Sequence, residues 1–236
     1  MIPQGHRERM PCSKLIAAIA RRWLFAPILI VLAVGVAHAL DFDRLLDRFL
    51  GLGGSAPVFR EWQQLLTDAK SLGTKEKLRR VNDFFNRGLQ FGDDQEIWGE
   101  SDYWATLLET LAKGRGDCED FTTAKYFTLL SAGVPGEQLR LVYVKAKIGG
   151  ASSHVTQAHM VLAYYDTPEA DPIVLDNLIT ELRPAARRPD LQPVFSFNGH
   201  GMWQGATGKA AAGGARTGRL SRWDDLLRRA KAEGFE

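Results

Sequence analysis

The stretch Gly114–Pro135, "GRGDCEDFTTAKYFTLLSAGVP", decides how this chain of 236 residues folds. Its residues favour a helix from Asp117 to about Ala132, where a glycine and a proline end the helical pattern. An aspartate suits the N-cap position, and acidic residues in the first turn suit the helix dipole. The sequence therefore predicts a helix that begins at Cys118, with acidic residues around the thiol.

The hydrophobic pattern changes after this helix. Before it, apolar residues recur at helical spacing in segments 41–50, 57–70 and 74–91, whereas residues 91–116 show no regular period. After it, the period becomes two in segments rich in β-branched and aromatic residues, which are 139–146, 157–165, 172–176 and 193–197. Helices followed by strands predict an α+β fold, with N-terminal helices packed on an antiparallel sheet.

Composition and charge limit the class of protein. A hydrophobic content of 45% suits one globular domain with its own core. The formal net charge is +2, but residues 1–39 hold five basic residues and one acidic residue, so the remainder has 25 basic and 27 acidic residues. The chain therefore gives no reason to expect a nucleic-acid partner.

The N-terminal segment has the three parts of a secretory signal peptide. A basic stretch ends at Arg22, an apolar run of about 15 residues follows at Trp23–Ala37, and Ala37-His38-Ala39 is a small-x-small cleavage sequence. We predict a signal peptide at residues 1–39, with an uncleaved membrane anchor as the alternative. Either one places the following domain on the far side of a membrane.

The rest of the chain divides into three predicted parts. Residues 40–204 form the domain, residues 205–218 a flexible Gly/Ala-rich linker, and residues 219–236 an amphipathic C-terminal helix. The apolar stripe of this helix consists of Leu220, Trp223, Leu227 and Ala230. It either docks on the domain or binds a partner.

Cys118 is a candidate nucleophile. Cys12 lies in the predicted signal peptide, so the mature chain keeps one cysteine and forms no internal disulfide. A lone cysteine also serves as a small buried hydrophobic residue. A nucleophile needs a base and a group that orients the base. Of the three remaining histidines, His154 and His200 lie in loops, whereas His159 lies in a predicted strand that fixes its ring.

His159 taken alone is more typical of a half-buried sheet residue, but Asp176 is a candidate group to orient its ring. In a hairpin centred near Thr167–Pro168, Asp176 lies opposite His159 or one diagonal step away. Such neighbours are about 5–8 Å apart at Cβ, and a slip of one residue would put them on opposite faces. A cysteine on a helix, a histidine on a strand and an aspartate on the next strand form a papain-like or transglutaminase-like arrangement.

The chain resembles the LapG-type bacterial transglutaminase-like cysteine proteinases. The motifs that carry this resemblance occur in the family's order and are "DYWAT", "GDCEDFTTAKYFTLLSAGVP", "LRLVYVKA", "AHMVLAYY", "VLDNL" and "DLQPVFSFNGHGMW". The family's catalytic residues fall on Cys118, His159 and Asp176. The chain departs from the family at Leu107, where a proline is expected, and in the long loop that carries His154.

The resemblance implies a papain/transglutaminase-like fold and a calcium-dependent periplasmic endopeptidase. Such an enzyme cleaves the N-terminal retention region of a large outer-membrane adhesin at a paired-alanine site, which releases the adhesin and promotes biofilm dispersal. The resemblance also implies sequestration by an inner-membrane cyclic-di-GMP receptor. A transglutaminase-type amide transferase, which uses the same thioester, and a non-catalytic peptide-binding module are the alternatives.

The acidic residues beside Cys118 have two interpretations. As structure, Asp117 caps the helix and Asp120 resembles a capping-box partner, but their charges should raise the pKa of the thiol. A divalent cation would reverse that effect, and calcium takes six or more oxygen ligands. The resemblance implies calcium at the acids that flank the cysteine, which are Asp117, Glu119 and Asp120, with Asp93, Asp94 and Glu96 as further candidates.

Two further roles stay open in the sequence. The backbone N–H of Cys118, at a helix N-terminus, is a candidate oxyanion donor, and the second donor is not identified. Trp104 is either a wall of the substrate pocket or a core residue, and core packing is the preferred role.

Overall fold

The computed structural model describes residues 40–149, 152–206 and 218–235. The chain divides into two units, Met1–His38 and Ala39–Glu236, and only the second contains described residues. The predicted signal peptide and residues 207–217 of the predicted linker therefore lie outside the described residues. Within the described ranges, no helix has the length and apolar character needed to cross a membrane.

The helices confirm most of the predicted pattern. The chain forms α1 (Phe42–Gly51), α2 (Ala56–Ala69), α3 (Thr74–Gly88), α4 (Asp94–Ile97), α5 (Leu107–Lys113), α6 (Cys118–Ser131) and α7 (Gly218–Glu233). Helices α1, α2 and α3 lie in the three segments predicted to be helical, although α3 ends before residue 91. The segment after α3 forms β1 (Gln90–Phe91), which pairs in parallel with β2 (Arg115–Gly116).

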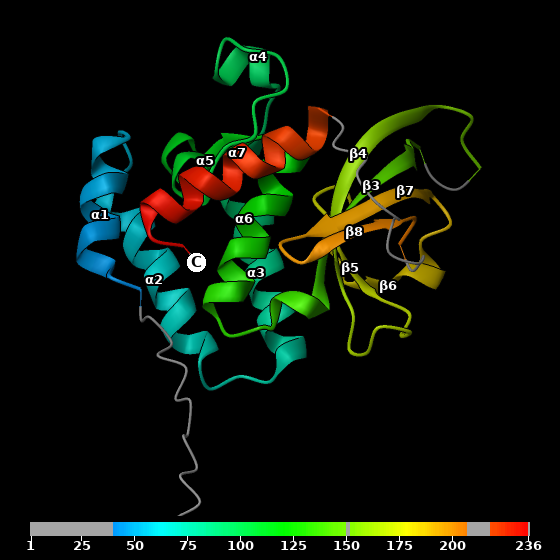
Figure 1. The fold of residues 1–236 in the computed structure, drawn as a ribbon, viewed down its shortest axis with the longest axis horizontal. Coiled ribbons are helices and arrows are strands. Elements are labelled where there is room, and N and C mark those ends of the chain that lie inside the picture. The colour runs from blue at the N-terminus through cyan, green and yellow to red at the C-terminus, as the bar shows by residue number, and fades with distance from the viewer. Residues whose placement is uncertain (1–39, 150–151, 207–217, 236) are drawn as a thin grey trace, which may run out of the picture. The chain divides into compact units, whose positions relative to one another are not determined.

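The strands form one antiparallel sheet of six, in the order β6-β5-β4-β3-β7-β8. They are β3 (Leu139–Lys147), β4 (Thr156–Tyr164), β5 (Ile173–Leu175), β6 (Arg183–Pro184), β7 (Leu191–Asn198) and β8 (Gly201–Gln204). The short strands β6 and β8 lie at the two edges and were not predicted. Helices gather on one side of the molecule and the sheet on the other (Figure 1). The predicted α+β fold is confirmed.

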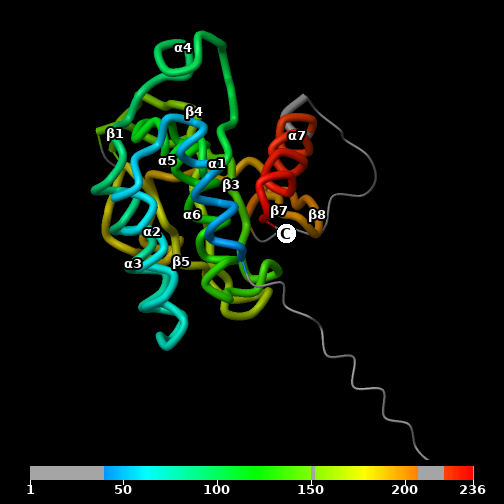
Figure 2. The backbone as a smooth tube through the Cα atoms, turned by 90° about the vertical axis from the view of Figure 1, so that its left-hand side faces the viewer, coloured from blue at the N-terminus to red at the C-terminus, as the bar shows by residue number. Residues whose placement is uncertain are grey.

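Helix α6 is the centre of this arrangement. Its residues from Asp120 to Leu129 are all buried, which is typical of a helix covered on every side. It packs against β4 and α3, and Figure 2 shows it between α7 and the pair α2 and α3. The indole N–H of Trp62 on α2 donates to Thr128 Oγ1 at 3.1 Å. The first residue of α6 is therefore fixed by the whole core.

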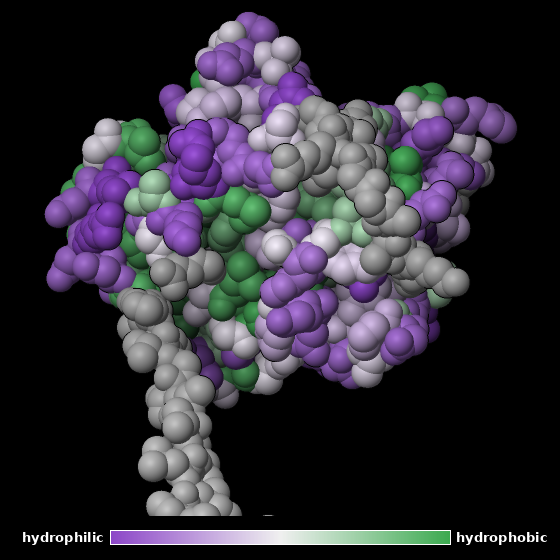
Figure 3. Space-filling model, viewed as in Figure 1, coloured by the Kyte–Doolittle hydropathy of each residue, from purple (hydrophilic) through white to green (hydrophobic). Residues whose placement is uncertain are grey.

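Helix α7 docks on the domain. Trp223, Leu226 and Ala230 are buried in the main core, and the Trp223 ring lies 5.6 Å from that of Tyr126 on α6. Leu226 is fully buried, whereas Leu227 of the predicted stripe is only half-buried. The face of the molecule shown in Figure 3 is largely hydrophilic around this docked helix, with hydrophobic atoms exposed in patches between the helices.

Candidate active site

The start of α6 presents Cys118 to the site. Asp117 is the N-cap, and its Oδ1 accepts from the backbone N–H groups of Glu119 at 3.1 Å and Asp120 at 3.4 Å. Cys118 is therefore the first helical residue, and its own N–H has no partner within the helix. The predicted cap and the predicted start of the helix are both confirmed.

His159 and Asp176 meet on one face of the sheet. Leu162 on β4 lies opposite Leu175 on β5, so the next residue, Asp176, is one diagonal step from His159. The ring Nε2 of His159 lies 2.8 Å from Oδ1 of Asp176, and both side chains are buried. The diagonal arrangement is one of the two that the predicted hairpin allowed. The ring's other nitrogen, Nδ1, is the one left to exchange a proton with a thiol.

Two further donors hold the Asp176 carboxylate. Its Oδ1 also accepts from the backbone N–H of Leu178 at 3.0 Å, and its Oδ2 accepts from Nη2 of Arg188 at 2.7 Å. Burial raises the pKa of Asp176, but the hydrogen bonds and charges of His159, Leu178 and Arg188 together outweigh burial and lower it to about 2. Asp176 is therefore an ionised carboxylate at neutral pH.

The sequence analysis did not identify Arg188 as a residue of the site. It is 2% exposed and also donates from Nε to Asp190 Oδ1 at 3.0 Å. It lies in an irregular loop twelve residues after Asp176, where no period indicates burial. Helix α3 adds a second support, because Asn86 Nδ2 donates to the backbone carbonyl of Asp176 at 2.7 Å.

Packing of α6 on β4 brings Cys118 beside the histidine strand. Thr122 Oγ1, one turn after Cys118, donates to the backbone carbonyl of Met160 at 3.1 Å. The backbone of Met160, the residue after His159, lowers the pKa of Cys118 slightly by favouring its thiolate, although burial and the acids outweigh this effect. By contrast, His154 and His200 are exposed, and His200 lies 3.7 Å from Glu137. The predicted strand histidine is thus buried beside the first turn of α6, whereas both loop histidines are exposed.

The acidic residues oppose ionisation of the thiol. Cys118 Sγ lies 2.7 Å from Glu119 Oε2, to which the thiol donates. Burial, followed by the charges of Glu119 and Asp117, raises the pKa of Cys118 far above its usual range. In the absence of a cation the thiol is therefore protonated, as the sequence suggested.

Three carboxylates form a compact acidic cluster. Asp94, Asp117 and Asp120 each contribute an oxygen within 4.8 Å of the others. Burial, with smaller contributions from neighbouring acids, raises the pKa of Asp94 to about 6, that of Asp117 to about 9 and that of Asp120 to about 8. These raised values express mainly the cost of burying a charged carboxylate and, to a smaller extent, the cost of placing like charges together.

The oxygen atoms of this cluster fit a hard cation. Asp94 Oδ2 accepts from the Tyr103 N–H at 2.6 Å, and Asp120 Oδ1 accepts from the Ala105 N–H at 2.9 Å. The other oxygens, Asp94 Oδ1 and Asp120 Oδ2, are buried without a hydrogen-bond partner. The backbone N–H of Asp117 is close enough to lower the pKa of Asp120, but it forms no hydrogen bond with Asp120 Oδ2. In both Asp94 and Asp120, one carboxylate oxygen is thus held by a backbone N–H, and the other is available to a cation.

Glycine is needed next to the cluster. A Cβ at Gly116 would lie 2.6 Å from Asp120 Cβ and 2.8 Å from Asp120 Oδ2.

Of the predicted ligands, Asp117 and Asp120 are in the cluster, whereas Glu119 faces the thiol. Asp94, a secondary candidate in the sequence, is the third member, and Glu96 instead pairs with Arg115 at 3.0 Å.

Trp104 has the core role that the sequence favoured. It is 3% exposed, and its ring stacks on Phe197 at a centroid distance of 5.9 Å.

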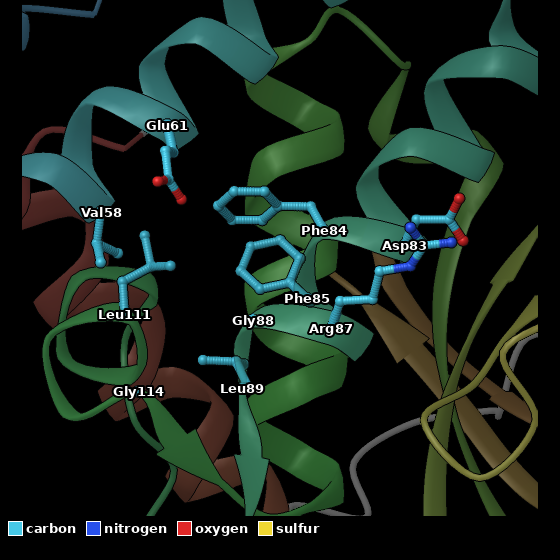
Figure 4. Close-up of a pocket in the computed structure, with 10 residues that line it drawn as sticks. All are labelled: Val58, Glu61, Asp83, Phe84, Phe85, Arg87, Gly88, Leu89, Leu111 and Gly114. Carbon is cyan, nitrogen blue, oxygen red and sulfur yellow. The ribbon is translucent and has the colours of Figure 1, made fainter.

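A separate cavity of about 500 Å³ lies between α2, α3 and α5, with Phe84, Leu89 and Leu111 in its wall (Figure 4). Cys118, His159, Asp176 and the acidic cluster all lie outside the lining of that cavity.

Comparison with known proteins agrees with this site. The family model for bacterial transglutaminase-like cysteine proteinases (BTLCP) matches residues 62–189, more than half of the chain and a range that includes Cys118, His159 and Asp176. A search of the curated proteins gave no match.

Solved structures of a relative extend the agreement. Calcium-bound LapG from Legionella pneumophila is 35% identical with a TM-score of 0.66, and the match covers 80% of this chain and 98% of that chain. The EGTA-treated form of the same protein is 36% identical with a TM-score of 0.65, covering 80% and 97%. The chain therefore belongs to the family of bacterial transglutaminase-like cysteine proteinases.

Proposed function

We propose that this protein is a calcium-dependent periplasmic cysteine endopeptidase with Cys118, His159 and Asp176 as its catalytic triad. The observation that carries the proposal is the buried bond between His159 and Asp176 beside the helix that begins at Cys118. A histidine oriented by an ionised carboxylate is the base that a thiol nucleophile needs.

Each residue has a defined step in peptide hydrolysis. The Cys118 thiolate attacks the scissile carbonyl carbon, and the N–H of Cys118 at the helix N-terminus donates to the developing oxyanion. His159, as the imidazolium, gives its proton to the leaving amine, and a thioester forms on Cys118. Water, deprotonated by His159, then hydrolyses the thioester. Asp176 keeps the ring oriented and stabilises its charged form through both stages.

Asp94, Asp117 and Asp120 would hold calcium in this proposal, with further oxygen ligands from the main chain or water. Bound calcium supplies positive charge next to the cluster and the thiol. The two buried carboxylate oxygens without partners support this assignment. So does the relative, whose structures include calcium-bound and EGTA-treated forms.

The proposed substrate is the N-terminal retention region of a large outer-membrane adhesin, cut at a paired-alanine site. Release of the adhesin would promote biofilm dispersal, and an inner-membrane cyclic-di-GMP receptor would sequester the protease. Family membership supports this substrate and this regulator, and the secretory pattern of residues 1–39 supports a periplasmic location.

Incubation of the adhesin's N-terminal region with purified protein tests the proposal. Wild type with calcium should cut the fragment once, and Cys118→Ala, His159→Ala or excess chelator should abolish the cut. His154→Ala is the matched control, because that histidine is exposed and should leave cleavage unchanged. Cleavage by Cys118→Ala, or no cleavage by wild type with calcium, would reject this activity. Incorporation of an added amine in place of cleavage would indicate amide transfer.

A further inference from the structure

The polar contacts of α7 converge on one segment of the domain, residues 102–109. Arg222 pairs with Asp102 at 3.0 Å, and Glu233 Oε1 accepts from Thr106 Oγ1 at 2.7 Å. Arg229 makes the largest number of these contacts. Its partners are Glu109 at 2.6 Å, the Tyr103 hydroxyl at 3.2 Å and the backbone carbonyl of Trp104.

The apolar side of α7 fixes the helix against α6. Trp223 is 3% exposed, and its ring packs at 5.6 Å from Tyr126 and 6.2 Å from Phe127. Because α6 is the central helix, α7 has a rigid base from which its polar side chains reach residues 102–109. Figure 1 shows α7 lying across α5 and α6.

The same segment anchors two carboxylates of the acidic cluster. The Tyr103 N–H donates to Asp94, and the Ala105 N–H donates to Asp120. The carbonyl of Trp104 and the N–H of Ala105 belong to one planar peptide unit. Arg229 therefore binds one end of the peptide group whose other end binds Asp120, and such chains of hydrogen bonds strengthen one another.

We infer that α7 is a brace for the calcium site and that Arg229 is its central positioning residue. The inference rests on the proposed calcium site at Asp94, Asp117 and Asp120. Arg229 fixes the peptide plane and, through it, the direction of the Asp120 carboxylate. Arg222 holds the start of the same segment at Asp102, and Glu233 holds Thr106 inside it. Calcium affinity thus depends on a helix that begins more than ninety residues after the last of these ligands.

Calcium titration calorimetry on the purified protein tests the brace. Arg229→Met keeps the length and apolar stem of the side chain but removes its five donors, and it should weaken calcium binding about tenfold, the usual effect of losing a residue that orients a metal ligand. Arg229→Lys should fall between Arg229→Met and wild type. Arg228→Met is the matched control, because Arg228 is exposed on the same helix and pairs with Asp225, and it should bind calcium as wild type does.

Hydrogen exchange gives a second measurement that a purely structural role would not change. Coupling between two sites is reciprocal, so calcium should slow amide exchange in α7 of the wild type. It should not do so in Asp94→Asn, which removes a proposed ligand but none of the α7 contacts. If Arg229→Met does not fold, Arg222→Gln takes its place, because it removes only the exposed ion pair with Asp102. Its calcium affinity should be about threefold weaker than that of wild type.

The possible failures are distinguishable. If the wild type binds no calcium, or if Asp94→Asn binds it as tightly as wild type, the proposed calcium site is wrong. If the wild type binds calcium and Asp94→Asn does not, but Arg229→Met matches Arg228→Met, the site stands and the brace is rejected. Unchanged exchange in α7 on calcium addition would also reject the brace.

Discussion

Asp176 cannot be replaced by asparagine without conflict. Its Oδ1 accepts from His159 and Leu178, and its Oδ2 accepts from Arg188. Both oxygens therefore face donors. An asparagine must turn its NH₂ group toward Arg188 or toward His159 and Leu178, so this substitution should be severely destabilising. Arg188→Gln should relieve the conflict, because a glutamine offers its amide oxygen to the new NH₂ group.

The magnitude follows from the carboxylate's surroundings. A carboxyl whose pKa falls from 3.8 to about 2 on folding contributes about 2 kcal/mol to stability at neutral pH. A buried donor left facing another donor costs about 1–3 kcal/mol more. Asp176→Asn should therefore lower the free energy of unfolding by roughly 3–5 kcal/mol, in line with breaking a buried ion pair. The double variant Asp176→Asn/Arg188→Gln should regain about 1–2 kcal/mol.

Urea unfolding at pH 7 with saturating calcium measures these values for wild type, both single variants and the double variant. Asp176→Ala serves as the reference for loss of the whole carboxylate. Two results would show that the described acceptor geometry around Asp176 is wrong. One is a free energy of unfolding for Asp176→Asn within about 1 kcal/mol of wild type. The other is a double variant whose loss of stability equals the sum of the two single losses.

Two further predictions concern other parts of the site. Gly116→Ala would place a Cβ 2.8 Å from Asp120 Oδ2, so calorimetry should show about tenfold weaker calcium binding; unchanged affinity would mean that this glycine does not shape the cluster. Burial raises the pKa of Glu233 from 4.5 to about 7. Between pH 4.5 and 7 the folded protein keeps the proton on Glu233, whereas the unfolded chain has lost it. The free energy of unfolding should therefore fall by up to about 3 kcal/mol as the pH rises through this range. Glu233→Gln should remove that part of the pH dependence in urea unfolding, and an unchanged profile would contradict the burial of this carboxyl.

The sequence predicted the elements whose pattern is local. Helix α6 and the strands around His159 have clear periods, and the pairing of His159 with Asp176 followed from the length of one hairpin. The short helices α4 and α5 were missed, because one or two turns do not establish a period. The edge strands β6 and β8 were missed for the same reason.

The unpredicted parts of the site depend on contacts between distant segments. Arg188 lies in a loop, and its burial depends on its contacts with Asp176 and Asp190. Asp94 was only a secondary candidate in the sequence, because its position in the cluster depends on contacts such as the N–H of Tyr103. The contact of Arg229 with Trp104 joins residues 125 positions apart. The family resemblance implied Glu119 as a calcium ligand, and this stays a prediction; in the structure, its carboxylate accepts from the Cys118 thiol.

The most direct test of the central claim needs no substrate. It is the rate at which iodoacetamide alkylates Cys118 at neutral pH with calcium present, followed by mass spectrometry so that Cys12 is counted separately. If His159 holds Cys118 as a thiolate–imidazolium pair, wild type should react at least about tenfold faster than His159→Ala. His154→Ala should match wild type. Equal rates for wild type and His159→Ala would contradict the account.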